Sequence, residues 1–146
     1  MIAFLIVSCD KYSDLWKPMF HTLFKYWPDC PYKIYLASNT KIFNHPKVCN
    51  ISFGEDKDYS TNLISILAQV EEERLIYWFD DVLLTKKVDT NFVQNIINEA
   101  VTSDLDHLKL SVDSPLYYGN RSEIFGPIKK GVKYRSAIGM ALYKKS

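Results

Sequence analysis

Two adjacent aspartates, Asp80 and Asp81, are the residues of this 146-residue chain best suited to chemistry. They directly follow the apolar run 75–79, so two carboxylates are expected to leave a buried strand together. Such a pair suits a hard divalent cation, Mg²⁺ or Mn²⁺, which is usually shared between the carboxylates and the phosphates of a substrate. The plainer alternative is that one aspartate caps a turn and the other pairs with Lys86 or Lys87.

Two further polar clusters follow apolar runs in the same way. Asp10 could accept a hydrogen bond from a base or ribose, but capping the next helix is the more frequent role of such a residue. Asn39 could contact a base edge or lie in a turn, where Asn is favoured. Cys9, at the end of a predicted strand, is more typical of a small buried hydrophobic residue than of a nucleophile. The clusters are Ser8, Cys9 and Asp10 after the run 2–7, and Ser38 and Asn39 after the run 32–37.

Alternating strands and helices are expected to position these residues. The periodicity predicts an α/β fold with a mostly parallel sheet, right-handed crossovers and a single domain. The carboxyl ends of parallel strands share one edge of the sheet, so the three clusters should lie together there. Strands are predicted over 2–7, 32–37, 48–53, 75–79 and 107–112, and a short element is expected near Tyr134. Helices are predicted to begin near Ser13 or Asp14, Ser60 or Thr61, and Asp89 or Thr90.

Composition narrows the classes of function. Lys and Arg number 18 against 17 for Asp and Glu, for a net charge of +1. This balance argues against a nucleic-acid binder that neutralises many phosphates, and against a polybasic membrane anchor. The run 2–7 is too short for a transmembrane span.

Three cysteines without metal-ligand spacing indicate reduced thiols in a cytoplasmic protein. Neither a GxxxxGK[ST] nor a GxGxxG phosphate-binding motif is present.

Three stretches resemble a bacterial glycosyltransferase family associated with capsule and lipopolysaccharide biosynthesis. They are FLIVSCDKYSDLW (4–16), YWPDCP (26–31) and YWFDDVLL (77–84), and the resemblance extends to about residue 110. It implies the Rossmann-like GT-A, or nucleotide-diphospho-sugar transferase, fold. The whole chain, 1–146, would be one such domain, with the donor half at about 1–85 and a partial acceptor half at about 86–146. We expect the C-terminal acceptor part to be cut short.

The resemblance also implies an activity and a site. The protein would transfer a sugar from a nucleotide-diphosphate donor to a glycan or lipid-linked acceptor, supported by Mn²⁺ or Mg²⁺. Asp80 and Asp81 fall where such enzymes carry their DxD metal motif, but here the aspartates are adjacent and Val82 takes the third position. Asp81 is then the better metal ligand. The residues expected near the donor are Ser8, Cys9, Asp10, Asn39 and Asp80.

The acceptor side is the least defined part of this hypothesis. Asp113 is the best remaining candidate for a catalytic base, although it could equally be a turn residue before Pro115. The short chain leaves a second hypothesis open, a non-catalytic donor-binding or assembly domain derived from such an enzyme. A nucleotidyltransferase is disfavoured because no Gly-rich loop could cradle a triphosphate. We expect a cytoplasmic protein, free or peripheral at the inner face of the membrane, whose exposed sheet edge could pair with a second copy.

Overall fold

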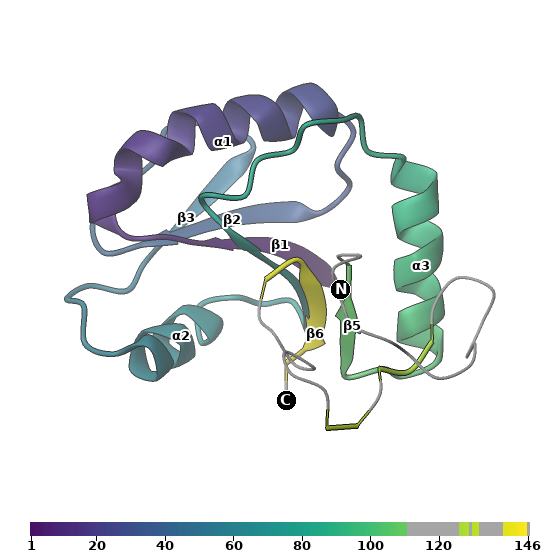
Figure 1. Cartoon of the computed structure of the whole chain (residues 1–146). Coiled ribbons are helices and arrows are strands. Elements are labelled where there is room, and N and C mark those ends of the chain that lie inside the picture. Colours follow the sequence, from purple (N-terminus) through teal and green to yellow (C-terminus); the bar gives the residue numbers. More distant parts are fainter. Residues whose placement is uncertain (111–125, 129, 132–138, 146) are drawn as a thin grey trace.

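The computed structural model describes residues 1–110, 126–128, 130–131 and 139–145 (Figure 1). Within them lies a six-stranded sheet of order β3-β2-β1-β4-β6-β5. Only β6 runs against the other five strands. The strands are β1 (Ile2–Val7), β2 (Lys33–Ser38), β3 (Val48–Ser52), β4 (Arg74–Phe79), β5 (His107–Lys109) and β6 (Ala141–Lys144). The helices are α1 (Ser13–Tyr26), α2 (Tyr59–Leu67) and α3 (Thr90–Thr102), with a 3-10 turn, η1 (Asp10–Tyr12), before α1.

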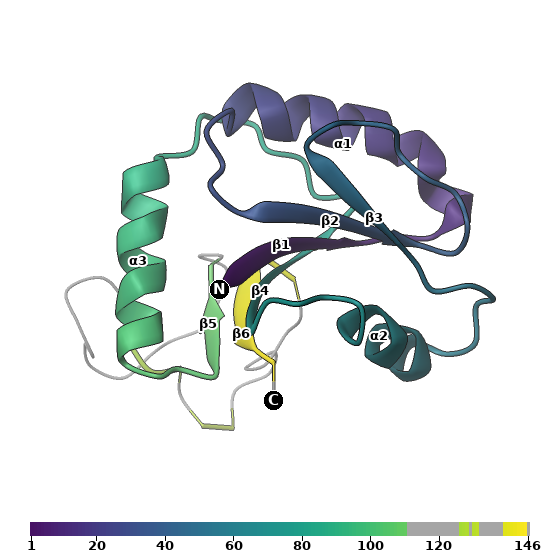
Figure 2. The same cartoon turned by 180° about the vertical axis from the view of Figure 1, so that it is seen from behind.

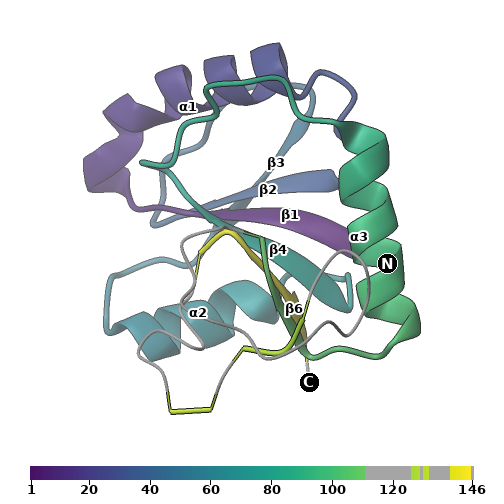
Figure 3. The same ribbon diagram turned by 45° about the vertical axis from the view of Figure 1, so that its right-hand side comes forward.

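Helices cover both faces of the sheet, which confirms the predicted α/β class. α1 and α3 lie on one face and α2 lies on the other, as Figure 2 and Figure 3 show from two sides. The alternation of strand side chains explains the two layers. In β1, Phe4 and Ile6 pack with α1, whereas Ala3 and Leu5 pack toward α2. β1 is apolar throughout because both of its faces are buried.

The first helix buries the aromatic face that its spacing predicts. Trp16, Met19, Phe20 and Leu23 are all buried against the sheet, so these residues form core and not a ligand platform. The predicted cap at Ser13 or Asp14 was wrong. Both residues lie inside the helix, and Tyr12 precedes it without a side-chain capping bond. The turn η1 leads directly into α1, and the backbone N–H of Ser13 donates to the carbonyl of Asp10.

The other two helices have side-chain caps. Asp58 precedes α2 and accepts a hydrogen bond from the backbone N–H of Thr61 at 3.0 Å, so the helix begins earlier than the predicted Ser60 or Thr61. Asp89, one of the two predicted residues, caps α3 by accepting from the N–H of Phe92 at 3.0 Å. In both helices an aspartate oxygen satisfies a backbone donor that has no partner within the helix.

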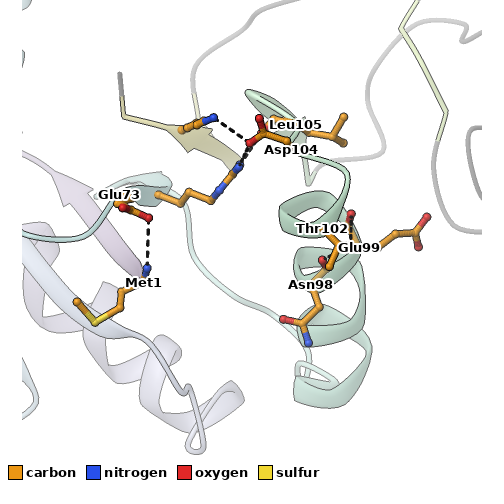
Figure 4. A network of polar contacts seen from close by, with 9 residues as sticks. Met1, Glu73, Asn98, Glu99, Thr102, Asp104 and Leu105 are labelled. Carbon is orange, nitrogen blue, oxygen red and sulfur yellow. Dashed lines mark hydrogen bonds and ion pairs between the residues drawn. The ribbon is translucent and has the colours of Figure 1, made fainter.

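The C-terminal strand β6 was not predicted from the sequence. It pairs with β4 from Arg74↔Lys144 to Tyr77↔Ala141 and separates β4 from β5. A charged cluster stabilises this arrangement (Figure 4). The carboxylate of Asp104 accepts from the guanidinium of Arg74 at 2.9 Å and from the Lys144 ammonium at 2.8 Å. Arg74 also donates to the carbonyl of Leu105, so the turn between α3 and β5 is held against β4.

Two sequence predictions fall partly or wholly outside the residues that the structure describes. The predicted strand 107–112 is observed as the shorter β5. Residues 111–125 lie outside the described part of the chain. The short element expected near Tyr134 also lies outside the described residues. Within the described part of the chain, no helix has the length and apolar character needed to cross a membrane.

Candidate functional site

The three polar clusters meet at one edge of the sheet, as predicted. β1, β2 and β4 are parallel neighbours, so Ser8, Asn39 and Asp80 leave the sheet at the same edge. From β1 the chain moves outward through α1 to β2 and β3, then returns through α2 to β4 on the other side of β1 (Figure 1). The strand order therefore reverses between β1 and β4. A crevice outside the carboxyl ends of strands at such a point is where ligands bind in open α/β sheets.

A chain of hydrogen bonds joins the ends of β1 and β4. The indole Nε1–H of Trp16 donates to Oγ of Ser8 at 2.7 Å, and the Ser8 hydroxyl donates to Oδ2 of Asp80. An indole can only donate and an ionised carboxylate can only accept. With the indole donating to it, the serine hydroxyl donates to Asp80, which is a nearer acceptor than the carbonyl of Cys9 at 3.4 Å. Neither Trp16 nor Ser8 was predicted to hold the aspartate pair.

The two aspartates have different surroundings. Asp80 is 8% exposed, and burial raises the pKa of its carboxyl group above the ordinary value. The hydrogen bond from Ser8 lowers this pKa, while the negative charge of Asp81 raises it further. Asp81 is exposed. Asp80 is thus a buried acceptor within a network, whereas Asp81 presents its carboxylate to solvent.

This donor set fits a divalent cation only with help from a ligand. Oδ2 of Asp80 is already engaged with Ser8, and Asp81 is the exposed member of the pair. The described residues contain no group of three or more His, Cys, Asp or Glu side chains that could hold a metal ion. Mg²⁺ and Mn²⁺ are often held by one or two carboxylates, with phosphate and water oxygens completing the shell. Asp81, with one oxygen of Asp80 at most, fits that arrangement.

Asp10 was expected to cap α1, but its carboxylate contacts the bend after β2 instead. Its carboxylate accepts from the backbone N–H groups of Thr40 and Lys41 at 3.0 and 2.9 Å, and from the Thr40 hydroxyl at 2.6 Å. Desolvation alone would raise the pKa of Asp10. The hydrogen bonds from Thr40 and Lys41, with the Lys41 charge, outweigh it and lower this pKa below its ordinary value. Asp10 therefore ties η1 to the bend after β2.

Asn39 lies in a bend of the chain directly after β2. Its Oδ1 accepts from the backbone N–H of Asp10 at 2.9 Å, and its Nδ2 donates to the carbonyl of Gly54 at 3.0 Å. Gly54 has a φ of +81°, in the left-handed region that favours glycine. The side chain of Asn39 thus joins the segments that follow β1, β2 and β3, and its polar atoms already have partners within the chain.

A pocket of about 390 Å³ opens beside these segments, on the α2 side of β1. Its volume lies within the usual range for small-molecule sites, roughly 300–1,000 Å³. Ser8 and Cys9, both predicted site residues, line it together with residues that sequence reasoning missed. The missed polar and aromatic residues are Phe53, Asp56, Lys57, Asp58, Tyr59 and Asn62, and the apolar residues are Val7, Leu63 and Ile66.

The missed wall of the pocket is a loop held to the start of α2. Asn62 Nδ2 donates to Oδ1 of Asp56 at 2.5 Å, and the Thr61 hydroxyl donates to Asp58 at 2.6 Å. The sequence carried one signal of this wall, because Asp58 is a favoured N-cap residue at a helix start. Nothing in that pattern indicates that the loop folds back toward Ser8 and Cys9.

The three cysteines form no disulfide with one another. Cys49 is exposed, while Cys9 and Cys30 are half-buried. Burial raises the pKa of the Cys30 thiol to about 11, so this residue is protonated at neutral pH. Cys9 lines the pocket, which makes it the one cysteine placed to contact a ligand there.

Asp113, the predicted catalytic base, lies outside the described residues. A second, larger groove of about 580 Å³ lies between α2 and the strands β4 and β6. It is largely apolar, with Leu67, Leu75 and Tyr143 in its lining, and it contains none of the predicted site residues. The pocket at the carboxyl ends of the strands is therefore the candidate site.

The chain is an α/β protein with a six-stranded mixed sheet and a pocket of mixed polar and apolar lining at the end of β1. Comparison with models of protein families, with curated proteins and with solved structures found no match for it.

Proposed function

We propose that the protein is a glycosyltransferase of the GT-A type that binds a nucleotide-diphospho-sugar at this edge. One observation carries the proposal. The pocket lined by Ser8 and Cys9 lies at the end of β1, and Asp80 and Asp81 leave the neighbouring strand β4 at the same edge. A nucleotide sugar needs an enclosed site for its base and a cation near its phosphates, and both can be supplied there.

The two parts of the donor would occupy different sides of β1. Ser8 bonds toward Trp16 and Asp80 on the α1 side, whereas Val7 and Cys9 line the pocket on the α2 side. The nucleoside would enter the pocket, and the diphosphate would extend across the strand end toward Asp81. A cation held by Asp81 would offset the repulsion between the carboxylates and the diphosphate and assist departure of the leaving phosphate. The acceptor would be a glycan or a lipid-linked sugar in surface polysaccharide synthesis.

A non-catalytic donor-binding domain is the second candidate, and a specific observation favours it. The polar side-chain atoms of Asn39 and the carboxylate of Asp10 are used in contacts within the chain. Of the predicted acidic residues that the structure describes, Asp81 is thus the one with an exposed carboxylate. Such a site would bind a nucleotide sugar without providing a base for the acceptor hydroxyl. Product formation with a panel of acceptors separates the two candidates.

Calorimetric titration with UDP, GDP and CDP sugars, with and without Mn²⁺, tests donor binding itself. We expect one of these donors to bind, and binding to strengthen with Mn²⁺. Asp81→Asn should remove most of the gain from Mn²⁺, because an amide keeps the oxygen but loses the charge. Asp80→Asn should remove less, since one oxygen of Asp80 is directed to Ser8. Failure of every donor to bind, or equal Mn²⁺ dependence in all three proteins, would refute the proposal.

A further inference from the structure

Two tyrosine hydroxyls meet between α2 and β4. The hydroxyl oxygens of Tyr59 and Tyr77 are 3.0 Å apart, and either can donate to the other. Tyr77 is buried, and burial together with the neighbouring hydroxyl of Tyr59 raises its pKa, so it is neutral. Tyr59 is the first residue of α2 and is 49% exposed, although it lines the pocket. The ring of Tyr59 is therefore held at the pocket by a contact with a buried residue of β4.

The composition of the pocket indicates which part of a ligand it accepts. The apolar part of its lining is formed by Val7, Phe53, Leu63 and Ile66. Two carboxylates, those of Asp56 and Asp58, also line it together with the ammonium of Lys57. The lining therefore keeps a net negative charge, which disfavours a phosphate inside the pocket. A flat, uncharged ring with polar edges suits such a wall better than a phosphate does.

We propose that the nucleobase of the ligand stacks on the ring of Tyr59, and that Tyr77 is a positioning residue that fixes this ring through its hydroxyl. The inference rests on the proposed function, since it assumes that the ligand is a nucleotide. Aromatic rings stack with any base, and loss of such a ring typically costs about five- to 150-fold in affinity. A ring held in place before binding loses less conformational entropy when the base arrives.

Titration of the nucleoside diphosphate that binds the wild-type protein, followed by calorimetry, tests the inference. Tyr59→Ala should weaken binding about tenfold or more. Tyr12→Ala is the matched control, because Tyr12 is 48% exposed but does not line the pocket, and its affinity should equal that of the wild type. A sugar 1-phosphate serves as the second ligand, and its affinity should be the same with and without the Tyr59 ring.

A double-mutant cycle tests the role of Tyr77. Tyr59→Phe and Tyr77→Phe each remove one hydroxyl of the pair, so each should weaken nucleotide binding by about two- to fivefold, and the double variant should be no weaker than either. Melting curves identify any variant that fails to fold. Wild-type affinity in Tyr59→Ala, additive losses in the double variant, or a loss confined to the sugar phosphate would overturn this inference while the proposed function stands. Absence of nucleotide binding by the wild-type protein would instead refute the proposed function.

Discussion

The hydroxyl of Ser8 donates a hydrogen bond to the carboxylate of Asp80, and this contact joins the ends of the adjacent strands β1 and β4. The serine stands 72 residues before the aspartate in the chain. Trp16 fixes the direction of the bond, because its indole N–H occupies the acceptor side of the serine oxygen. A core helix therefore controls the orientation of a carboxylate at the candidate site.

Trp16→Phe should disturb the site as well as the core. The substitution removes the indole donor, so the Ser8 hydroxyl can turn away from Asp80. We expect a loss of about 1–3 kcal/mol in the free energy of unfolding from the missing hydrogen bond and the smaller ring. We also expect weaker binding of the nucleotide sugar. Urea unfolding and calorimetric titration measure the two effects.

Trp27→Phe is the matched control for this prediction. Trp27 is 5% exposed against 3% for Trp16, and its indole donates to the hydroxyl of Thr90 at 3.0 Å. The stability loss should therefore be similar, but the site should keep its affinity. Equal losses of affinity in the two variants would show that Trp16 acts only through global stability.

Asp80→Asn should change how stability depends on pH. The folded protein raises the pKa of Asp80 above its ordinary value of 3.8, mainly through burial, so the folded state binds this proton more tightly than the unfolded state. The stabilising contribution is complete below pH 3.8 and is lost as the pH rises through the folded pKa. The variant has no such proton, so its stability relative to the wild type should increase with pH.

Urea unfolding of both proteins at several pH values between about 4 and 7 measures this difference. The other carboxyl groups, including Asp10 and Asp104 with their lowered pKa values, are common to both proteins and largely cancel in the comparison. A difference that stays constant or decreases with pH would contradict the assignment of Asp80 as a buried acid.

Gly139→Ala should be strongly destabilising. Gly139 has a φ of +97°, and an added Cβ would lie 2.5 Å from a ring carbon of Phe79, the residue before Asp80. Backbone strain and the displaced ring together should cost about 2–6 kcal/mol. Gly54→Ala, at φ +81° with no atom within 4 Å of the added Cβ, should cost only the conformational strain, about 1 kcal/mol. Thermal melting of both variants compares the two losses of stability. Equal losses would contradict this prediction, because they would mean that the Phe79 ring moves aside at no cost.

The sequence predicted the parallel half of the sheet well, for physical reasons. Strand β1 is apolar in all six residues because helices cover both of its faces, and this pattern is visible without a structure. The meeting of Ser8, Asn39 and Asp80 at one edge follows from strand direction alone. Strand β6 could not be predicted in the same way, since its four residues are stabilised by pairing with β4 and β5, which are distant in sequence.

The roles of individual polar residues were harder to predict than their positions. Asp10 has a residue type and place that suit a helix cap, yet its carboxylate faces Thr40 and Lys41, about thirty residues away. Tyr59 resembles any surface tyrosine in the sequence and reaches the pocket only because α2 packs across the sheet. Such contacts depend on tertiary packing, which the local pattern of residues does not encode.

Mapping a bound nucleotide sugar by two-dimensional amide NMR tests the central claim most directly. On titration with UDP, GDP or CDP sugars in the presence of Mg²⁺, we predict shifts of the amide signals of Ser8, Cys9, Phe53 and Tyr59 around the pocket, and of Asp81 at the end of β4. Signals of Leu67 and Lys145 in the apolar groove should stay unchanged. Shifts confined to that groove, or no shifts with any of these donors, would contradict the assignment of this edge as a donor site.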